Sequence, residues 1–184
     1  MSSAVNFIIG LIYLMLPGIF ANMAPIIVRK HFKLLATPLD LKKELNKKRI
    51  LGDNKTYRGL IFGILFAIIM AYIQAFLYNY ASFQSISLIN YEQINAPLLG
   101  FLIGFGVLLG DAVESFIKRR FNISPGQPFI PWDQIDSALG GIMFISFIYP
   151  LTFTQSITII LLAFLSSIST THIGFYLGFR KKKW

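Results

Sequence analysis

The chain has 184 residues, of which 55% are hydrophobic and only 14% are charged, with a formal net charge of +9 and a mean hydropathy of +0.63. Soluble domains carry about 25% charged residues, so this composition excludes an ordinary water-soluble domain. The sequence contains no cysteine, which excludes disulfide bonds and thiolate chemistry. The apolar residues fall in blocks separated by polar stretches, a pattern that is typical of helices crossing a membrane.

Five apolar blocks predict five membrane helices in a single membrane domain covering residues 1–184. The expected spans are about 4–28, 59–80, 97–117, 135–150 and 155–179. Pro17 and Pro25 interrupt the first block and predict a kinked or broken helix. The fourth block is short, because a helix needs about 20 residues to cross the hydrocarbon layer. The sequence thus predicts an all-α integral membrane protein, with two cytoplasmic loops, 29–58 and 118–134, forming a polar site at the inner face.

The basic residues indicate how the chain is oriented in the membrane. All 17 Lys and Arg lie in three stretches, with ten in residues 29–58, three in 118–120 and four in 180–183. With five spans, all three stretches fall on the same side. Cytoplasmic loops carry the excess of Lys and Arg, so we expect a multi-pass protein of the cell membrane with its N-terminus outside and its C-terminus in the cytoplasm. Anchoring to anionic lipid head groups is an alternative role for these charges.

Half of the eight acidic residues cluster within 26 positions of the chain. Four polar residues in this region recur at helical spacing and therefore share one helix face: Asp111, Glu114, Ser115 and Lys118. Asp133 and Asp136 are three residues apart at the start of the next apolar block. Because a short loop joins the two helices, we expect a hairpin that brings both acidic pairs together near the cytoplasmic face.

The residue types in this cluster suit a site for phosphate and a divalent cation. Mg²⁺ prefers carboxylates, water and phosphate oxygens as ligands, and it is the cofactor that we expect. Lys118 and Arg119 would neutralise phosphate charge that the metal leaves uncovered. The expected metal ligands are Asp111, Glu114, Asp133 and Asp136. The alternative is a network of internal salt bridges in which Asp136 simply caps its helix.

The end of the first cytoplasmic loop offers a second group of phosphate donors. It reads Gly-Asp-Asn-Lys-Thr-Tyr-Arg-Gly over residues 52–59. The two glycines permit tight turns, and Lys55, Thr56 and Arg58 carry cationic or hydroxyl donors. The spacing is not that of a Walker A phosphate loop. A merely basic loop end is the alternative interpretation.

Taken together, these motifs resemble the signature of the integral-membrane CDP-diacylglycerol synthases. The match is closer to their archaeal relatives, the CDP-archaeol synthases. The first loop is similar to that family's Asn-Lys-Thr-x-Arg-Gly, and residues 131–136 read Pro-Trp-Asp-x-x-Asp. Residues 127–132 lack the Lys, Asp and His of the bacterial pattern. The positions that carry the second motif are Gly110, Asp111, Glu114, Ser115, Lys118, Arg119, Pro125, Gly126, Asp133 and Asp136.

The resemblance implies a CTP-dependent cytidylyltransferase. The enzyme would transfer CMP from CTP to an archaeal isoprenoid diether glycerol phosphate, giving CDP-archaeol and pyrophosphate in membrane phospholipid biosynthesis. The implied cofactor is Mg²⁺, and the implied partners are CTP, the lipid and the membrane. Nucleic acid is not among the expected partners, and a homodimer is an open alternative to a monomer.

The resemblance also implies roles for individual residues. Lys118, Arg119, Asp133 and Asp136 are the expected catalytic residues. Asn54 would read the base or cap the loop. The residues expected to bind CTP or its phosphates are Asn54, Lys55, Thr56, Arg58, Ser115, Pro125 and Gly126.

Two other functions fit parts of the pattern. A CDP-alcohol phosphotransferase is also a Mg²⁺-dependent membrane enzyme, but its signature begins with Asp-Gly, whereas Gly110 and Asp111 stand here in the reverse order. A small transporter or channel subunit would use border carboxylates and broken helices for an ion pathway. The polar residues of this chain instead gather on one side of the membrane.

Overall fold

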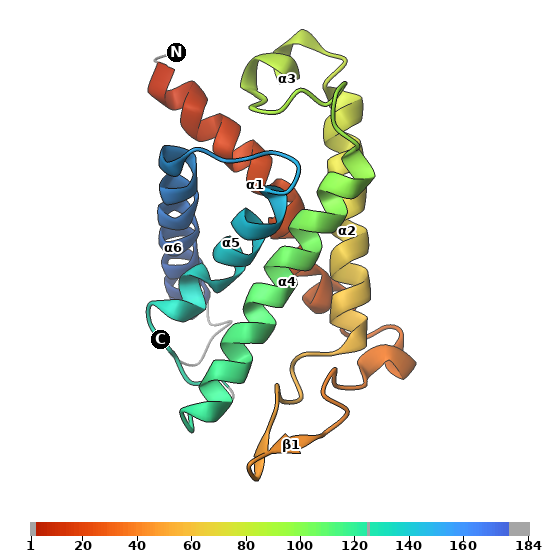
Figure 1. The fold of residues 1–184 in the computed structure, drawn as a ribbon, viewed down its shortest axis with the longest axis vertical. Coiled ribbons are helices and arrows are strands. Elements are labelled where there is room, and N and C mark those ends of the chain that lie inside the picture. Colours follow the sequence, from red (N-terminus) through yellow and green to blue (C-terminus); the bar gives the residue numbers. More distant parts are fainter. Residues whose placement is uncertain (1–2, 125, 177–184) are drawn as a thin grey trace.

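The computed structural model describes residues 3–124 and 126–176, and within them helices dominate (Figure 1). The α-helices are α1 (Ser3–Ile27), α2 (Tyr57–Leu77), α3 (Ala81–Ile86), α4 (Ala96–Arg120), α5 (Trp132–Ile145) and α6 (Phe153–Tyr176). The first loop contains a 3₁₀ turn, η1 (Lys33–Ala36), and an antiparallel hairpin of β1 (Glu44–Leu45) and β2 (Lys48–Arg49). The predicted class, an all-α membrane protein, is confirmed.

Four helices are long and apolar enough to cross a membrane: α1, α2, α4 and residues Phe153–Ile173 of α6. Helix α5 has 14 residues and is therefore about 21 Å long, which is shorter than the roughly 30 Å hydrocarbon layer. The predicted fourth span, 135–150, thus differs in its bounds, because α5 starts earlier and ends at Ile145. The count of about five helices is close to the observed one, since α3 is a short helix at one end of the bundle (Figure 1).

Helix α1 continues through Pro17 and Pro25 without a break. Both prolines were expected to kink or break the helix, because proline lacks the N–H that the preceding turn needs. In a membrane bundle, neighbouring helices make such an interruption tolerable. Pro17 lies on the buried face of α1, where the residues Leu14 and Ala21 belong to the hydrophobic core.

Helix α4 runs diagonally through the bundle and contacts both α2 and α5 (Figure 1). Its contact with α5 is made by backbone against backbone. A Cβ atom on Gly106 would lie 2.5 Å from the carbonyl oxygen of Gly140, and one on Gly110 would collide with the carbonyl of Asp136. Only glycine permits this approach, and the approach sets Asp136 beside the face of α4 that carries Asp111.

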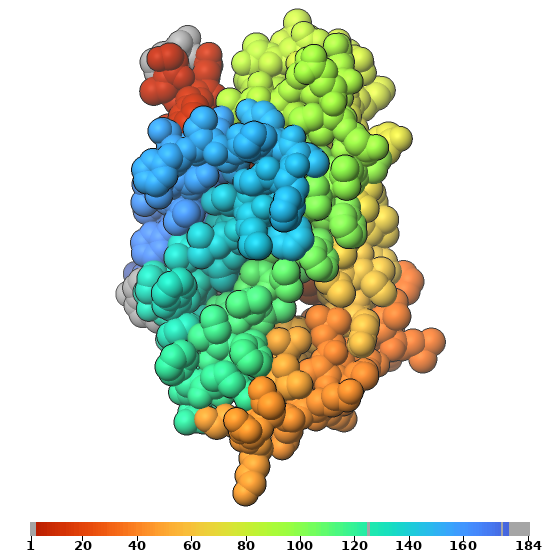
Figure 2. Space-filling model, viewed as in Figure 1, coloured from red at the N-terminus to blue at the C-terminus, as the bar shows by residue number. Residues whose placement is uncertain are grey.

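The helix termini bring the polar loops to one end of the bundle. Thr56 caps α2 at this end by accepting from the backbone N–H of Gly59. Asn95 caps α4 at the opposite end by accepting from the backbone N–H of Leu98. Helix α4 ends with three basic residues, 118–120, which suit the negative end of the helix dipole. Figure 2 shows the first loop packed against the end of α4, and we call this region the loop end.

We predict that Gly140→Ala lowers the free energy of unfolding by about 1–3 kcal/mol, since the added methyl group forces α4 and α5 apart. The measurement is thermal or denaturant unfolding of the purified protein in detergent. Gly59→Ala is the matched control, because a Cβ there lies 3.3 Å from the Pro25 ring and meets no facing backbone. Equal stability of the two variants would contradict the importance of the α4–α5 contact.

Candidate functional site

A polar cavity of about 180 Å³ lies at the loop end, between the first loop, α4 and the start of α5. It brings together residues that are up to 85 positions apart in the chain. The residues that line it are Leu51, Gly52, Asp53, Asn54, Lys55, Asp111, Glu114, Ser115, Lys118, Arg119, Gly126, Asp133 and Asp136. Both of the predicted polar motifs therefore contribute to one site.

Three carboxylates converge in this cavity. One oxygen each of Asp111, Glu114 and Asp136 lie within 4.8 Å of one another. Asp111 and Glu114 are one turn apart on α4, and Asp136 reaches them from α5 because of the close glycine contact. Carboxylate oxygens are the hard donors that Mg²⁺ and similar cations accept, so the donor set fits such an ion.

The fourth expected metal ligand, Asp133, is placed differently. It lies outside this group of three, and its Oδ1 is 2.8 Å from Nζ of Lys118. Its Oδ2 accepts the backbone N–H of Phe129 at 2.9 Å. Asp133 therefore fastens the α4–α5 connection and orients Lys118, and its role as a metal ligand stays a prediction.

Lys118 is the central cation of the α4–α5 junction. Its Nζ lies 3.1 Å from Oε1 of Glu114 as well as 2.8 Å from Asp133, and its side chain is only 9% exposed. Buried charges are costly unless they are paired, and here one ammonium group balances two carboxylates. The pairing holds the oxygens of both carboxylates in place.

The first loop joins this network through Lys55. Its Nζ is 2.5 Å from Oδ1 of Asp111, so the loop is attached directly to α4. Arg119 also lines the cavity, and its Nε is buried without an acceptor among the described residues. Such a donor is suited to an incoming anion, since an unsatisfied buried N–H is otherwise unfavourable.

The charges of the cavity are unequal. Five carboxylates and three cationic side chains line it, a formal excess of two negative charges. One divalent cation would balance this excess. The cationic groups lie on the first loop and at the end of α4, where they can face a phosphate that such a cation also contacts.

Several predicted phosphate contacts have other partners in the structure. Thr56 caps α2, and Arg58 donates to the carbonyl oxygens of Arg29 at 2.8 Å and His31 at 2.9 Å. Neither side chain lines the polar cavity. Asn54, Ser115 and Gly126 do line it, and Pro125 lies outside the described residues. The roles of all these residues in binding CTP stay predictions.

A second, larger cavity of about 440 Å³ lies between α1, α5 and α6 and is mainly apolar. Its lining includes Leu14, Met15 and Ile103, together with Asp133 and Asp136, which also line the polar cavity. The two cavities thus adjoin at these two aspartates. Charged side chains dominate the lining of one cavity, and apolar side chains dominate the lining of the other.

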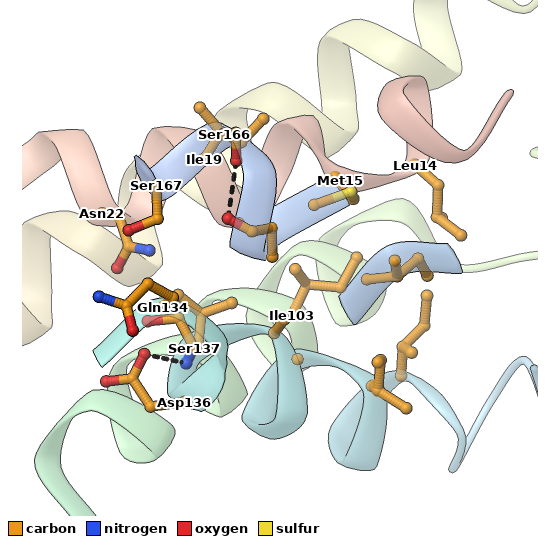
Figure 3. A pocket seen from close by; sticks show the side chains of 18 of the residues that line it. Leu14, Met15, Ile19, Asn22, Ile103, Gln134, Asp136, Ser137, Ser166 and Ser167 are labelled. Atoms are coloured by element: carbon orange, nitrogen blue, oxygen red, sulfur yellow. Dashed lines mark hydrogen bonds between the residues drawn. The ribbon is translucent and has the colours of Figure 1, made fainter. Parts of the chain in front are cut away.

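The polar groups of the larger cavity gather at one end of it. Figure 3 shows Asn22, Gln134, Ser137 and Ser167 close to Asp136, whereas Leu14 and Met15 lie toward the other end. Sequence analysis missed these neutral residues. The available signal was weak: Asn22 is isolated in an apolar helix, and hydroxyl residues are common in α6.

The fold and the two adjoining cavities define the class of the protein. It is a membrane protein whose charged site lies at the end of a helix bundle, beside an apolar cavity between the helices.

Comparison with known proteins identifies the family. A family model described as "CarS-like: CDP-archaeol synthase" matches residues 4–184. The CDP-archaeol synthase of Methanocaldococcus jannaschii is 32% identical over 149 residues, which are 80% of this chain and 84% of that protein. The CDP-archaeol synthase of Sulfolobus acidocaldarius is 29% identical over 98% of this chain and 99% of its own length. The chain belongs to the CDP-archaeol synthase family.

A solved structure supports the same conclusion. It is described as an intramembrane enzyme for archaeal membrane lipids biosynthesis, and it aligns with a TM-score of 0.71 at 27% identity, covering 86% of this chain and 90% of that one. The family membership confirms the predicted enzyme class, a cytidylyltransferase. It decides against the phosphotransferase and transporter alternatives.

We predict that Lys118→Met lowers the free energy of unfolding by about 3 kcal/mol, because Glu114 and Asp133 then face each other with no cation between them. The measurement is unfolding in detergent. Glu114→Gln added to Lys118→Met should restore part of the loss, since one of the two charges is removed.

The control for Lys118 is Lys47→Met, since Lys47 is exposed in the first loop. We expect this change to alter stability by less than about 0.5 kcal/mol. If both lysine variants were equally stable, the ion pairs of Lys118 would have no structural role.

Proposed function

We propose that this protein transfers CMP from CTP to an isoprenoid diether glycerol phosphate, forming CDP-archaeol and releasing pyrophosphate. The observation that carries the proposal is the contact between the polar and the apolar cavity at Asp133 and Asp136. The reaction joins a water-soluble polyanion to an amphiphilic lipid. It therefore needs two such compartments that meet where the phosphates react.

The polar cavity is the proposed site of the triphosphate. Lys55, Lys118 and Arg119 supply its positive charge. The proposed ligands of Mg²⁺ are Asp111, Glu114 and Asp136. When it is bound, the ion would neutralise part of the negative charge of the phosphates. These residues thereby allow the lipid phosphate and the triphosphate, both anionic, to approach each other.

The apolar cavity is the proposed site of the lipid. Its wall of Leu, Ile and Met side chains suits isoprenoid chains, and its polar end lies near Asp136 (Figure 3). Gln134 carries a buried side-chain oxygen without a partner among the described residues. That oxygen can only accept, so it is the amide N–H group of Gln134, which lines this cavity, that would donate to a phosphate or ether oxygen of the lipid.

The chemistry is an in-line displacement. An oxygen of the lipid phosphate attacks the α-phosphorus of CTP, and the bond from that phosphorus to the oxygen bridging to the β-phosphate breaks. The lipid phosphate is already ionised at neutral pH, so no general base is required. Lys118 and Arg119 would stabilise the negative charge that collects on the departing pyrophosphate.

The charge distribution supports a location of this site on the cytoplasmic side of the cell membrane. Ten of the 17 Lys and Arg residues lie in residues 29–58, which supply the first-loop part of the cavity. The N-terminus would then lie outside. CTP would reach the polar cavity from the cytoplasm.

The direct test is the formation of a CDP-lipid by the purified protein, followed by thin-layer chromatography with labelled CTP. We expect product with the diether substrate and Mg²⁺, and none after chelation of the metal with EDTA.

Asp136→Asn should lower kcat by at least about 100-fold, because it removes a carboxylate from the group of three. Glu92→Gln, in the exposed loop at the other end of the bundle, is the control. Wild-type protein that did not consume CTP would refute the proposed function.

The proposed lipid site in the apolar cavity leads to a separate prediction. Ala163 of α6 lines it, and Ala163→Phe fills part of the volume that the lipid chains would occupy. We expect the KM for the lipid to rise about tenfold or more while the KM for CTP changes less than about twofold. The same substitution at Leu161, which is 55% exposed on the outer face of α6, should leave both constants unchanged. An equal rise of both KM values for Ala163→Phe would place the lipid elsewhere.

A further inference from the structure

Arg120, the last residue of α4, organises the hairpin of the first loop. Its guanidinium donates to the carbonyl oxygens of Leu45 at 2.7 Å, Lys48 at 3.2 Å and Arg49 at 2.6 Å. The same group lies 5.1 Å from the centre of the Phe116 ring. A planar guanidinium directs donors on separate nitrogens to several fixed acceptors at once, whereas a lysine offers a single ammonium nitrogen. Arg120 therefore fixes the hairpin relative to α4.

The contact is reciprocal. Nζ of Lys48 donates to the backbone carbonyl of Arg120 at 3.2 Å. The last carbonyls of a helix have no partner within the helix, so this bond satisfies a group that would otherwise need water. The hairpin and the end of α4 are thus joined in both directions.

The hairpin is tied in turn to the cavity segment, which we define as residues 51–55. Arg49 binds Asp40 through two hydrogen bonds of 2.8 and 3.2 Å. One oxygen of Asp40 also accepts the backbone N–H groups of Leu51 and Gly52, both at 3.0 Å. The side chain of Asp40 is fully buried beneath the loop. It is the only described carboxylate of the first loop that organises backbone groups of the cavity segment.

The environment of Asp40 keeps it charged. Burial by itself raises the pKa of this carboxyl, but the hydrogen bonds from Arg49 and from the N–H groups of Gly52, Leu51 and Lys42 outweigh burial and hold the pKa well below its ordinary value. An ionised Asp40 is therefore present throughout the neutral range. Asp40 therefore remains a charged acceptor for Arg49 and for the backbone of the loop at neutral pH.

The cavity segment is fixed at its other end as well. The carbonyl of Lys55 accepts the N–H of Leu39 at 2.7 Å, and Lys55 Nζ contacts Asp111 of α4. The chain of contacts thus leaves α4 at Arg120 and returns to it at Asp111, nine residues earlier. All five residues of the cavity segment line the polar cavity.

We propose that Arg120 and Asp40 are positioning residues for the nucleotide: they hold the cavity segment over the polar cavity so that Asn54 and Lys55 are placed for CTP before it binds. Neither residue lines the cavity, so both act through the segment. This inference rests on the proposed function. It predicts a defect in nucleotide affinity that is separate from chemistry and from lipid binding, because preorganised groups lose less entropy when a ligand binds.

Steady-state kinetics of the full-length protein in detergent tests the inference. For Arg120→Gln and Asp40→Asn we expect the KM for CTP to rise about tenfold, since a charged hydrogen bond typically contributes about 1.5 kcal/mol or more. The KM for the lipid and kcat should stay within about twofold of wild type. Arg120→Lys should be intermediate, because it retains the charge and can make only part of the contacts.

Two further measurements separate the loss of positioning from a general loss of charge. Lys47→Gln removes a positive charge from the same hairpin at an exposed position, and it should leave the KM for CTP unchanged. Limited trypsin digestion measures directly how firmly the loop is held. Cleavage within residues 42–58 should be faster in Arg120→Gln and Asp40→Asn than in wild type. This measurement does not require an active variant.

Three results would overturn the inference: a loss confined to kcat, an equal rise in KM for CTP with Lys47→Gln, or unchanged trypsin cleavage in both variants. Failure of the proposed function looks different, because wild-type protein itself would then form no CDP-lipid. Trypsin cleavage would still report whether Arg120 and Asp40 fix the loop.

Discussion

Close backbone contact between α4 and α5 is the constraint on which the rest of the site depends. Glycines at positions 106, 110 and 140 let the two helices approach until a single added methyl group would meet a facing carbonyl. This approach carries Asp136 to the face of α4 that presents Asp111 and Glu114. A wider separation would leave Asp111 and Glu114 without the third oxygen donor, which α5 supplies.

Cations make that arrangement sustainable in a membrane protein. Lys118 lies between Glu114 and Asp133, and Lys55 reaches Asp111 from the first loop. Carboxylates this near to a bilayer are costly unless they are paired. In the proposed function, Lys55 and Lys118 would also bind phosphate oxygens of the nucleotide. The same few side chains would then serve both electrostatic stability and nucleotide recognition. Asp136 lines both the polar cavity and the apolar one.

Some parts of the site could be predicted from local sequence and others could not. The one-turn spacing of Asp111, Glu114 and Lys118 predicted their shared face, since a helix fixes the direction of each side chain. The same reasoning grouped Asp133 with the metal ligands, which stays a prediction, but it gave no sign of the hydrogen bond that Asp133 accepts from the backbone N–H of Phe129 in the loop before α5. Arg58 belongs to a motif that suggested phosphate binding, and in the structure it donates to the carbonyl oxygens of Arg29 and His31, just after α1. A motif gives residue types in order and does not say which neighbour each side chain meets.

The sequence alone determined the membrane class, the one-sided distribution of basic residues and the two polar motifs, because hydrophobicity, charge and helical spacing are properties of neighbouring residues. The tertiary structure decided which carboxylates converge, that Asn22 and Ser167 line the same cavity as Asp136, and that Arg120 holds a loop more than 70 residues earlier in the chain. Those contacts depend on the distance and rotation between helices. Packing between residues far apart in the chain sets both quantities, and no local pattern encodes them.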